Sequence, residues 1–130
     1  MNAVLLDTHA VHWWSAEPDR LSRPAHRAVE AADELLVAGI SWYELGWLAE
    51  RQRIAVDVPV RSWLEDLGAQ LRTIGITPAI AHSAVTLPHS FPRDPTDRLI
   101  YATAIELGVR LVTKDEAIAE YDRARSLVVW

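Results

Sequence analysis

The amino-acid sequence predicts an α/β fold, in which a five-stranded parallel β-sheet is covered by helices on both faces. Short apolar runs alternate along the chain with longer segments whose apolar residues recur at helical spacing. Strands separated by helical crossovers form βαβ units, and these units build parallel sheets. The 130 residues contain no repeat, linker or low-complexity tract, so we expect a single domain over residues 1–130.

Five strands are predicted from the short apolar runs. The first covers Val4–Leu6 and ends at Asp7, and the second covers Leu35–Ala38 and is closed by Gly39. The other three cover residues 73–76, 109–112 and 127–130. In sheets of this kind ligands bind beyond the carboxyl ends of the strands, so the residues that follow each strand are the first candidates for a site.

Capping residues predict where the helices begin. A first helix covers Thr8–Ser15, and Ser22 caps a second helix that runs to about Ala32. The pattern Ser41-Trp42-Tyr43-Glu44 is a capping box, which predicts a helix from Ser41 to about Gln52.

Four further helices are predicted in the second half of the chain. One begins at Pro59, and the others begin after Thr77, after Asp94 and from Asp115. Gly108 is expected to end the helix that follows Asp94. The apolar face of the helix at Pro59 carries Trp63, Leu64, Leu67 and Leu71.

Composition excludes several classes of function. There is no cysteine, so disulfides, zinc–thiolate sites and thiol nucleophiles are all absent. The net charge of -5 by itself argues against a nucleic-acid-binding surface, but an acidic metal pocket would raise the negative count and a bound cation would offset it. The N-terminus lacks a basic segment and Asp7 interrupts its apolar run, so we expect no signal peptide and a cytoplasmic protein.

Four acidic residues are expected at one edge of the predicted sheet. Asp7 follows the first strand and Asp115 follows the fourth, while Glu44 lies one turn into the helix after the second strand. A right-handed crossover brings the helix that carries Asp97 toward the same edge. Like charges this close repel unless a cation neutralises them, and an all-oxygen ligand set suits Mg²⁺ or Mn²⁺. Such an ion activates water and stabilises charge on a phosphodiester.

Each acid also has a purely structural interpretation. Glu44 can be the second member of the capping box, Asp97 can favour the helix dipole, and Asp94 and Asp115 can be N-caps. A non-catalytic or signalling α/β module of the receiver type is therefore the alternative. A receiver, however, carries an acid at the end of its third strand, where this sequence has Ile76-Thr77. A phosphatase of the HAD type needs a second Asp two residues after Asp7, where His9 stands.

Four stretches of the sequence together match the motifs of a known family. They read Leu-Leu-Asp-Thr-His-Ala at 5–10, Ser-Trp-Tyr-Glu-Leu at 41–45, Arg-Asp-Pro-Thr-Asp-Arg-Leu-Ile at 93–100 with Ala-Thr-Ala at 102–104, and Leu-Val-Thr-Lys-Asp at 111–115. Over nearly its whole length the chain resembles the PIN-domain family, and within it the VapC-type toxins of bacterial toxin–antitoxin modules.

The resemblance implies a fold, an activity and a set of site residues. The fold is a three-layer α/β/α arrangement with a five-stranded parallel sheet, and the activity is an endoribonuclease that needs Mg²⁺, with Mn²⁺ as a substitute. The partners implied are an RNA substrate and a small cognate antitoxin. A homodimer is also expected, because tryptophans outside the core can form an interface. The family's four acids match Asp7, Glu44, Asp97 and Asp115, and the supporting residues are Thr8, Asp94 and Thr113.

Three other groups of residues are candidates for binding. Five of the six tryptophans lie on predicted helices at apolar spacing, which favours core packing for most of them and leaves interface contacts or base stacking for the rest. His9 lies near Asp7 and can contact a substrate or simply pack. Arg93 and Arg98 flank the acids and are expected to pair with a carboxylate or to bind phosphate.

Overall fold

The computed structural model describes residues 1–130 and contains a five-stranded sheet in which every neighbouring pair of strands is parallel. The strands are β1 (Ala3–Leu6), β2 (Glu34–Ala38), β3 (Arg72–Ile74), β4 (Arg110–Val112) and β5 (Val128–Val129). Their order across the sheet is β3-β2-β1-β4-β5. The chain thus builds outward from β1 in one direction and then continues on the other side of β1 with β4, which makes the β1/β4 boundary the switch point.

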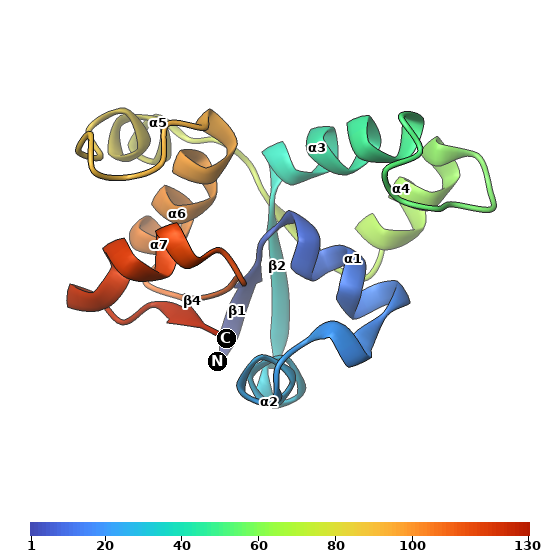
Figure 1. The fold of residues 1–130 in the computed structure, drawn as a ribbon, viewed down its shortest axis with the longest axis horizontal. Helices are drawn as coiled ribbons and strands as arrows, with labels where there is room; N and C mark the ends of the chain where they lie inside the picture. Colours follow the sequence, from blue (N-terminus) through green and yellow to red (C-terminus); the bar gives the residue numbers. More distant parts are fainter.

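Helices cover both faces of this sheet, as predicted (Figure 1). They are α1 (Thr8–Ala16), α2 (Arg23–Ala31), α3 (Gly39–Glu50), α4 (Val60–Gly68), α5 (Pro78–Val85), α6 (Pro95–Leu107) and α7 (Glu116–Tyr121). Figure 1 shows α1, α3 and α4 on one side of the strands and α5, α6 and α7 on the other, with the two termini close together. No helix is long and apolar enough to cross a membrane.

The core is divided by the sheet because successive strand residues point to opposite faces. Val4 and Leu6 of β1 pack on the α1/α3/α4 side, whereas Leu5 packs against α6 and α7 on the other side. Leu5 is directly paired with Leu36 of β2 and Leu111 of β4. The three innermost strands are buried on both faces, as expected for a parallel sheet.

The predicted capping box is wrong, and the helix that follows β2 begins earlier than predicted. α3 begins at Gly39, which therefore opens a helix and does not merely close the strand. Its N-cap is Ala38, which makes no side-chain capping bond. Ser41 is fully buried, and its hydroxyl accepts a 3.0 Å hydrogen bond from the Thr8 hydroxyl. The Ser41 side chain is therefore used in a tertiary contact and not in a local cap. Because α3 begins at Gly39, Glu44 lies in its second turn.

Other predicted boundaries differ by a few residues. β3 ends at Ile74 and β5 covers only two residues, because strand pairing stops there. α4 ends at Gly68, so Leu71 is buried but lies outside the helix whose face it was expected to share. Two short 3₁₀ helices, Pro18–Arg20 and Asp122–Ala124, were not predicted. The caps at Ser22, Thr77 and Asp94 and the left-handed Gly108, with φ of 63°, are as predicted.

Candidate active site

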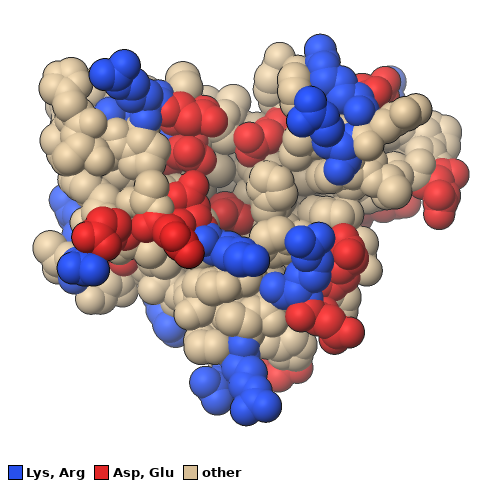
Figure 2. Space-filling view, in the orientation of Figure 1, with Lys and Arg blue, Asp and Glu red and all other residues tan.

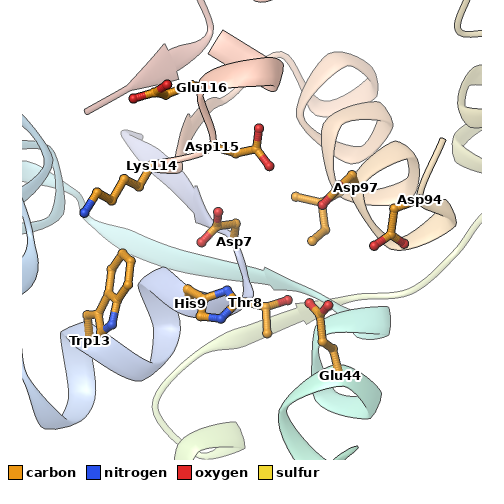
Figure 3. Close-up of a pocket in the computed structure, with 11 residues that line it drawn as sticks. Asp7, Thr8, His9, Trp13, Glu44, Asp94, Asp97, Lys114, Asp115 and Glu116 are labelled. Carbon is orange, nitrogen blue, oxygen red and sulfur yellow. The ribbon is translucent and has the colours of Figure 1, made fainter. Parts of the chain in front are cut away.

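A pocket of about 540 Å³ lies where β1 and β4 end, at the switch point of the sheet. Acidic side chains surround the hollow at the centre of this face, and basic side chains lie just below it (Figure 2). Six carboxylates line the pocket, those of Asp7, Glu44, Asp94, Asp97, Asp115 and Glu116. The four acids predicted to gather at this edge are therefore gathered there, together with the supporting residues Thr8 and Asp94 (Figure 3).

Asp7 and Asp115 reach the pocket from neighbouring strands. The Asp7 N–H donates to the Val112 carbonyl at 3.1 Å, which continues the β1–β4 pairing to the end of β1. Thr113 is fully buried between the two acids. Its hydroxyl accepts from the Asp115 N–H at 3.1 Å and lies near enough to the Asp7 carboxylate to lower the pKa of that acid. Thr113 thus connects the first acid to the fourth, although it does not itself line the pocket.

Glu44 and Asp97 come from helices on opposite faces of the sheet. Glu44 is half-buried on α3, and Asp97 is half-buried in the first turn of α6. Figure 3 shows both side chains beside the space that Asp7 and Asp115 border, with Asp94 farther out. Neither carboxylate makes a capping bond to a backbone N–H. The capping interpretation of Glu44 is therefore wrong, whereas Asp97 does lie in the first turn of α6, where the helix dipole favours an acid.

The other three aspartates act as caps and line the pocket at the same time. One carboxylate oxygen accepts a backbone N–H in each case, at 2.8 Å for Asp7, 2.9 Å for Asp94 and 3.0 Å for Asp115. A carboxylate has a second oxygen with further acceptor capacity. The cap fixes where each carboxylate points, and the capping interpretation does not compete with a role in the pocket.

Burial and mutual repulsion disturb the ionisation of two of these acids. Removal from water raises the pKa of Asp7, and the nearby Thr113 hydroxyl opposes that shift. Removal from water, followed by the charges of Asp94, Asp115, Glu44 and Asp7, raises the pKa of Asp97 to about 7. The pocket therefore holds more negative charge than it can stabilise alone, which is the electrostatic condition that favours a cation.

The donor set of the pocket suits a hard cation that keeps part of its water. As the side chains stand, no three acidic or histidine groups converge closely enough to hold one ion directly. The available donors are nevertheless carboxylate oxygens, and Mg²⁺ is commonly bound by one or two carboxylates while it retains several waters. The residues fit an ion that is contacted partly through water better than they fit a dehydrated protein cage.

Comparison with known families agrees with this geometry. The sequence model of the PIN domain matches residues 4–124, which is almost the whole chain. The chain belongs to the PIN-domain family. Over all 130 residues of both chains it is 59% identical to a protein named Ribonuclease VapC22 from Mycobacterium tuberculosis, strain ATCC 25618 / H37Rv, which places this PIN domain among the VapC proteins.

Solved structures of low sequence identity share the fold of this PIN domain. One is described as a toxin–antitoxin complex from Klebsiella pneumoniae, with 22% identity, a TM-score of 0.69, and 98% of this chain and 96% of that chain covered. Another is VapBC-1 from nontypeable Haemophilus influenzae, with 17% identity, the same TM-score of 0.69, and coverage of 97% and 95%. The three-layer arrangement predicted from the sequence is confirmed by these likenesses.

The expected pairing of Arg93 and Arg98 with a carboxylate is wrong for this PIN domain, whereas phosphate binding by Arg93 stays a prediction. Arg98 neither pairs with a carboxylate nor lines the pocket. Its guanidinium donates to five backbone carbonyls in the last turn of α5 and in the segment between α5 and α6, those of Ala84, Leu87, Pro88, Phe91 and Pro92. Arg93 is exposed, lies outside the pocket lining and forms no ion pair.

Four pocket residues were not singled out as site residues by the sequence analysis: Ile100, Lys114, Glu116 and Trp13, the last of which was considered only as one of the tryptophans. Lys114 and Glu116 directly flank Asp115, so adjacency to a candidate acid was the available signal. His9 and Trp13 stand four residues apart on α1, a spacing that puts two side chains on one helix face. Since His9 was already a candidate, the same face of the helix pointed to Trp13.

Proposed function

We propose that the 130 residues form a single PIN domain that acts as a metal-dependent endoribonuclease and as the toxin of a type II toxin–antitoxin module in the cytoplasm. The observation that carries the proposal is the set of six carboxylates around one pocket at the switch point of the sheet. The 59% identity to a VapC ribonuclease over the full length supports the choice of RNA as substrate. The receiver-like alternative is not favoured, because β3 ends at Ile74 with no acid after it.

The proposed metal ligands are Asp7, Glu44, Asp97 and Asp115, with Mg²⁺ as the ion and Mn²⁺ as a substitute. When bound, the ion would lower the pKa of water and offset the charge that develops on the phosphodiester. Thr8, Thr113 and Asp94 are supporting residues: Thr113 orients Asp7 and Asp115, Thr8 fixes the distance between α1 and α3, and Asp94 adds charge at the edge of the pocket.

The proposed reaction is hydrolysis of one phosphodiester bond. Water attacks the phosphorus in line and its proton passes to a pocket carboxylate. The bond from phosphorus to the 3′ oxygen breaks, and this oxygen takes up a proton from solvent. The products are a 3′-hydroxyl and a 5′-phosphate. The carboxylates of this chain orient the attacking water and accept its proton, and their caps and the Thr113 hydroxyl hold them in place for both roles.

Amide substitutions test the catalytic proposal. We expect Asp7→Asn, Glu44→Gln and Asp97→Asn each to lower the rate of RNA cleavage by several orders of magnitude, because each removes charge and a metal-binding oxygen from the pocket. Circular dichroism checks that the variants fold. Sequencing of RNA ends after brief expression of wild type and Asp7→Asn identifies the cleaved RNA and its site. Full cleavage activity in EDTA would disprove metal dependence.

A small antitoxin is the proposed protein partner. An apolar groove between α3 and α4 is lined by Trp42, Trp47 and Leu64, and its rim carries Tyr43 with 72% of its side chain exposed. A helix or strand with an apolar face fits such a groove. Glu44 follows Tyr43 directly on α3, so a chain docked in the groove can direct an Arg or Lys toward the acids and occupy the place of the cation.

The position of crosslinks tests the antitoxin proposal. With photoreactive residues at Trp47 and at exposed Arg123 as a distant control, we expect crosslinks to the antitoxin at Trp47 alone. Crosslinks confined to Arg123 would place the partner elsewhere.

We also expect the protein to form a homodimer. The measurement is the mass of the isolated protein by light scattering, and a monomer at all concentrations would contradict this expectation.

A further inference from the structure

One wall of the acidic pocket carries aromatic and basic side chains in place of carboxylates. Trp13 and His9 of α1 and Lys114 from the turn after β4 line this wall. The His9 and Trp13 rings lie 5.8 Å apart between centroids, and the Lys114 Nζ lies 5.9 Å from the centroid of the Trp13 ring. Figure 3 shows the Lys114 side chain reaching toward the indole on the side of Asp7 away from Asp94 and Asp97.

The charges around the pocket restrict the path of a bound nucleic-acid strand. A strand with its scissile phosphate among the six carboxylates carries further phosphates on either side, and these are repelled by the uncompensated acids. Lys114 is the only lysine or arginine that lines the pocket. It is exposed and forms no ion pair with any acidic side chain, so its charge is available to a phosphate.

The Trp13 indole also contacts two residues that do not line the pocket. The Trp130 ring lies 5.7 Å from it, and the Arg20 guanidinium lies over it at 5.0 Å from the ring centroid. Neither Trp130 nor Arg20 lines the pocket, and both restrict the motion of the indole. On the pocket side the indole meets Lys114 at 5.9 Å, near the outer limit of a cation–π contact, and a flexible lysine stem is easily moved aside.

We propose that Trp13 and Lys114 form a binding subsite for the nucleotide next to the scissile phosphate. The base stacks on the pocket-facing side of the Trp13 indole, while the Lys114 ammonium binds the backbone phosphate of the same nucleotide. Stacking of this kind tolerates any base, since every base presents a π face. The inference rests on the proposed ribonuclease function and adds to it the residues that position the RNA.

Removal of a single base from the substrate tests the subsite. The probe is a short RNA with the mapped cleavage site, together with two versions in which the nucleotide on either side of the scissile bond is abasic. We expect wild type to lose about tenfold in kcat/KM on one abasic version, mainly through KM. Trp13→Leu should cleave that version and the intact RNA at nearly equal rates, whereas Trp13→Phe should regain part of the preference.

Trp14→Leu is the matched control, because Trp14 is a half-buried neighbour on α1 that packs on the same core and does not line the pocket. We expect it to keep the full penalty for the abasic version. If Trp13→Leu slows both RNAs by the same factor and keeps the penalty, Trp13 is structural and the subsite is disproved. Should Trp13→Leu fail to fold, Lys114→Gln decides, because it changes only an exposed side chain.

A binding measurement separates this inference from the catalytic proposal. Anisotropy of the labelled RNA on the Asp97→Asn protein gives Kd without cleavage. We expect Lys114→Gln in that background to weaken binding and to reduce the dependence of log Kd on log salt by somewhat under one unit. If the protein binds the intact RNA more tightly than the abasic version but wild type never cleaves it, the ribonuclease proposal is disproved and the subsite stands. If wild type cleaves the RNA but Lys114→Gln leaves the salt dependence of Kd unchanged, the subsite is disproved and the ribonuclease proposal stands.

Discussion

At the scale of single residues, the ionisation of Asp97 reports how strongly the acids repel one another. Burial and four neighbouring carboxylates raise its pKa from 3.8 to about 7. Between these two values the folded protein holds a proton that the unfolded chain has released. The stability that this proton provides is complete below about pH 4 and is lost as the pH rises through about 7. Asp7 contributes in the same direction, because its pKa is also raised.

The melting temperature of the metal-free protein should therefore fall as the pH rises from about 4.5 to about 8. Asp97→Asn removes the charge, so its melting temperature should exceed that of wild type above pH 7, and the difference should shrink toward pH 4.5. Thermal denaturation in EDTA across this range is the measurement. If Asp97 served only the helix dipole, the amide would lower stability by about 0.3–1 kcal/mol at pH 7, which is the opposite sign.

At the scale of secondary-structure elements, two polar side chains of α6 connect this helix to neighbouring segments. The half-buried Arg98 links the N-terminal half of α6 to the last turn of α5 and to the segment after it through five carbonyls. Near the middle of α6, the fully buried Tyr101 hydroxyl donates a 2.6 Å hydrogen bond to Asp122. The other Asp122 oxygen accepts the Val128 N–H at 2.7 Å, so this aspartate joins α6 to the start of β5.

Tyr101→Phe should destabilise the protein by about 1–3 kcal/mol, because it leaves a buried carboxylate oxygen without its donor. Burial, and then the bond to Asp122, raise the pKa of Tyr101 above its usual range, so the phenol remains a donor at every pH at which the protein is handled. The measurement is urea denaturation, with Tyr43→Phe as control, since Tyr43 is 72% exposed. Equal effects of the two substitutions would contradict the proposed link.

At the scale of the whole molecule, the topology of the sheet brings distant parts of the sequence to one site. The chain adds β2 and β3 on one side of β1 and then places β4 on the other side. The acid after β1 and the acid after β4 become neighbours although they are separated by over a hundred residues of sequence. Helices from opposite faces supply Glu44 and Asp97, so the pocket exists only when both layers are assembled.

Metal binding should therefore stabilise the fold as a whole. A cation that binds the assembled pocket and not the unfolded chain adds about RT ln(1 + [L]/Kd), which is roughly 2.7 kcal/mol at a hundredfold excess over Kd. We expect millimolar Mg²⁺ or Mn²⁺ to raise the melting temperature of wild type and to raise that of Asp97→Asn much less. The absence of a shift in wild type would remove the support for a metal site at these carboxylates.

The sequence by itself determined the class of the fold and the four acids that gather at the pocket. Apolar runs of strand length, separated by helical spacing, are local patterns, and the caps at Ser22, Thr77 and Asp94 are local hydrogen bonds. Because parallel strands end at one edge, the positions of Asp7 and Asp115 after two strands were enough to predict that they meet. Their catalytic and metal-binding roles remain predictions.

Only the tertiary structure decided what each polar side chain contacts. Ser41 reads as a helix cap in the sequence, yet its hydroxyl is buried against Thr8 on another helix. Arg98 is predicted from the sequence to pair with the acids beside it, yet its guanidinium donates to carbonyls at the end of α5 and in the segment after it. The half-exposed wall of Trp13 and Lys114 depends on α1 and the turn after β4 lying side by side. Such contacts join residues distant in sequence, and local propensity carries no information about them.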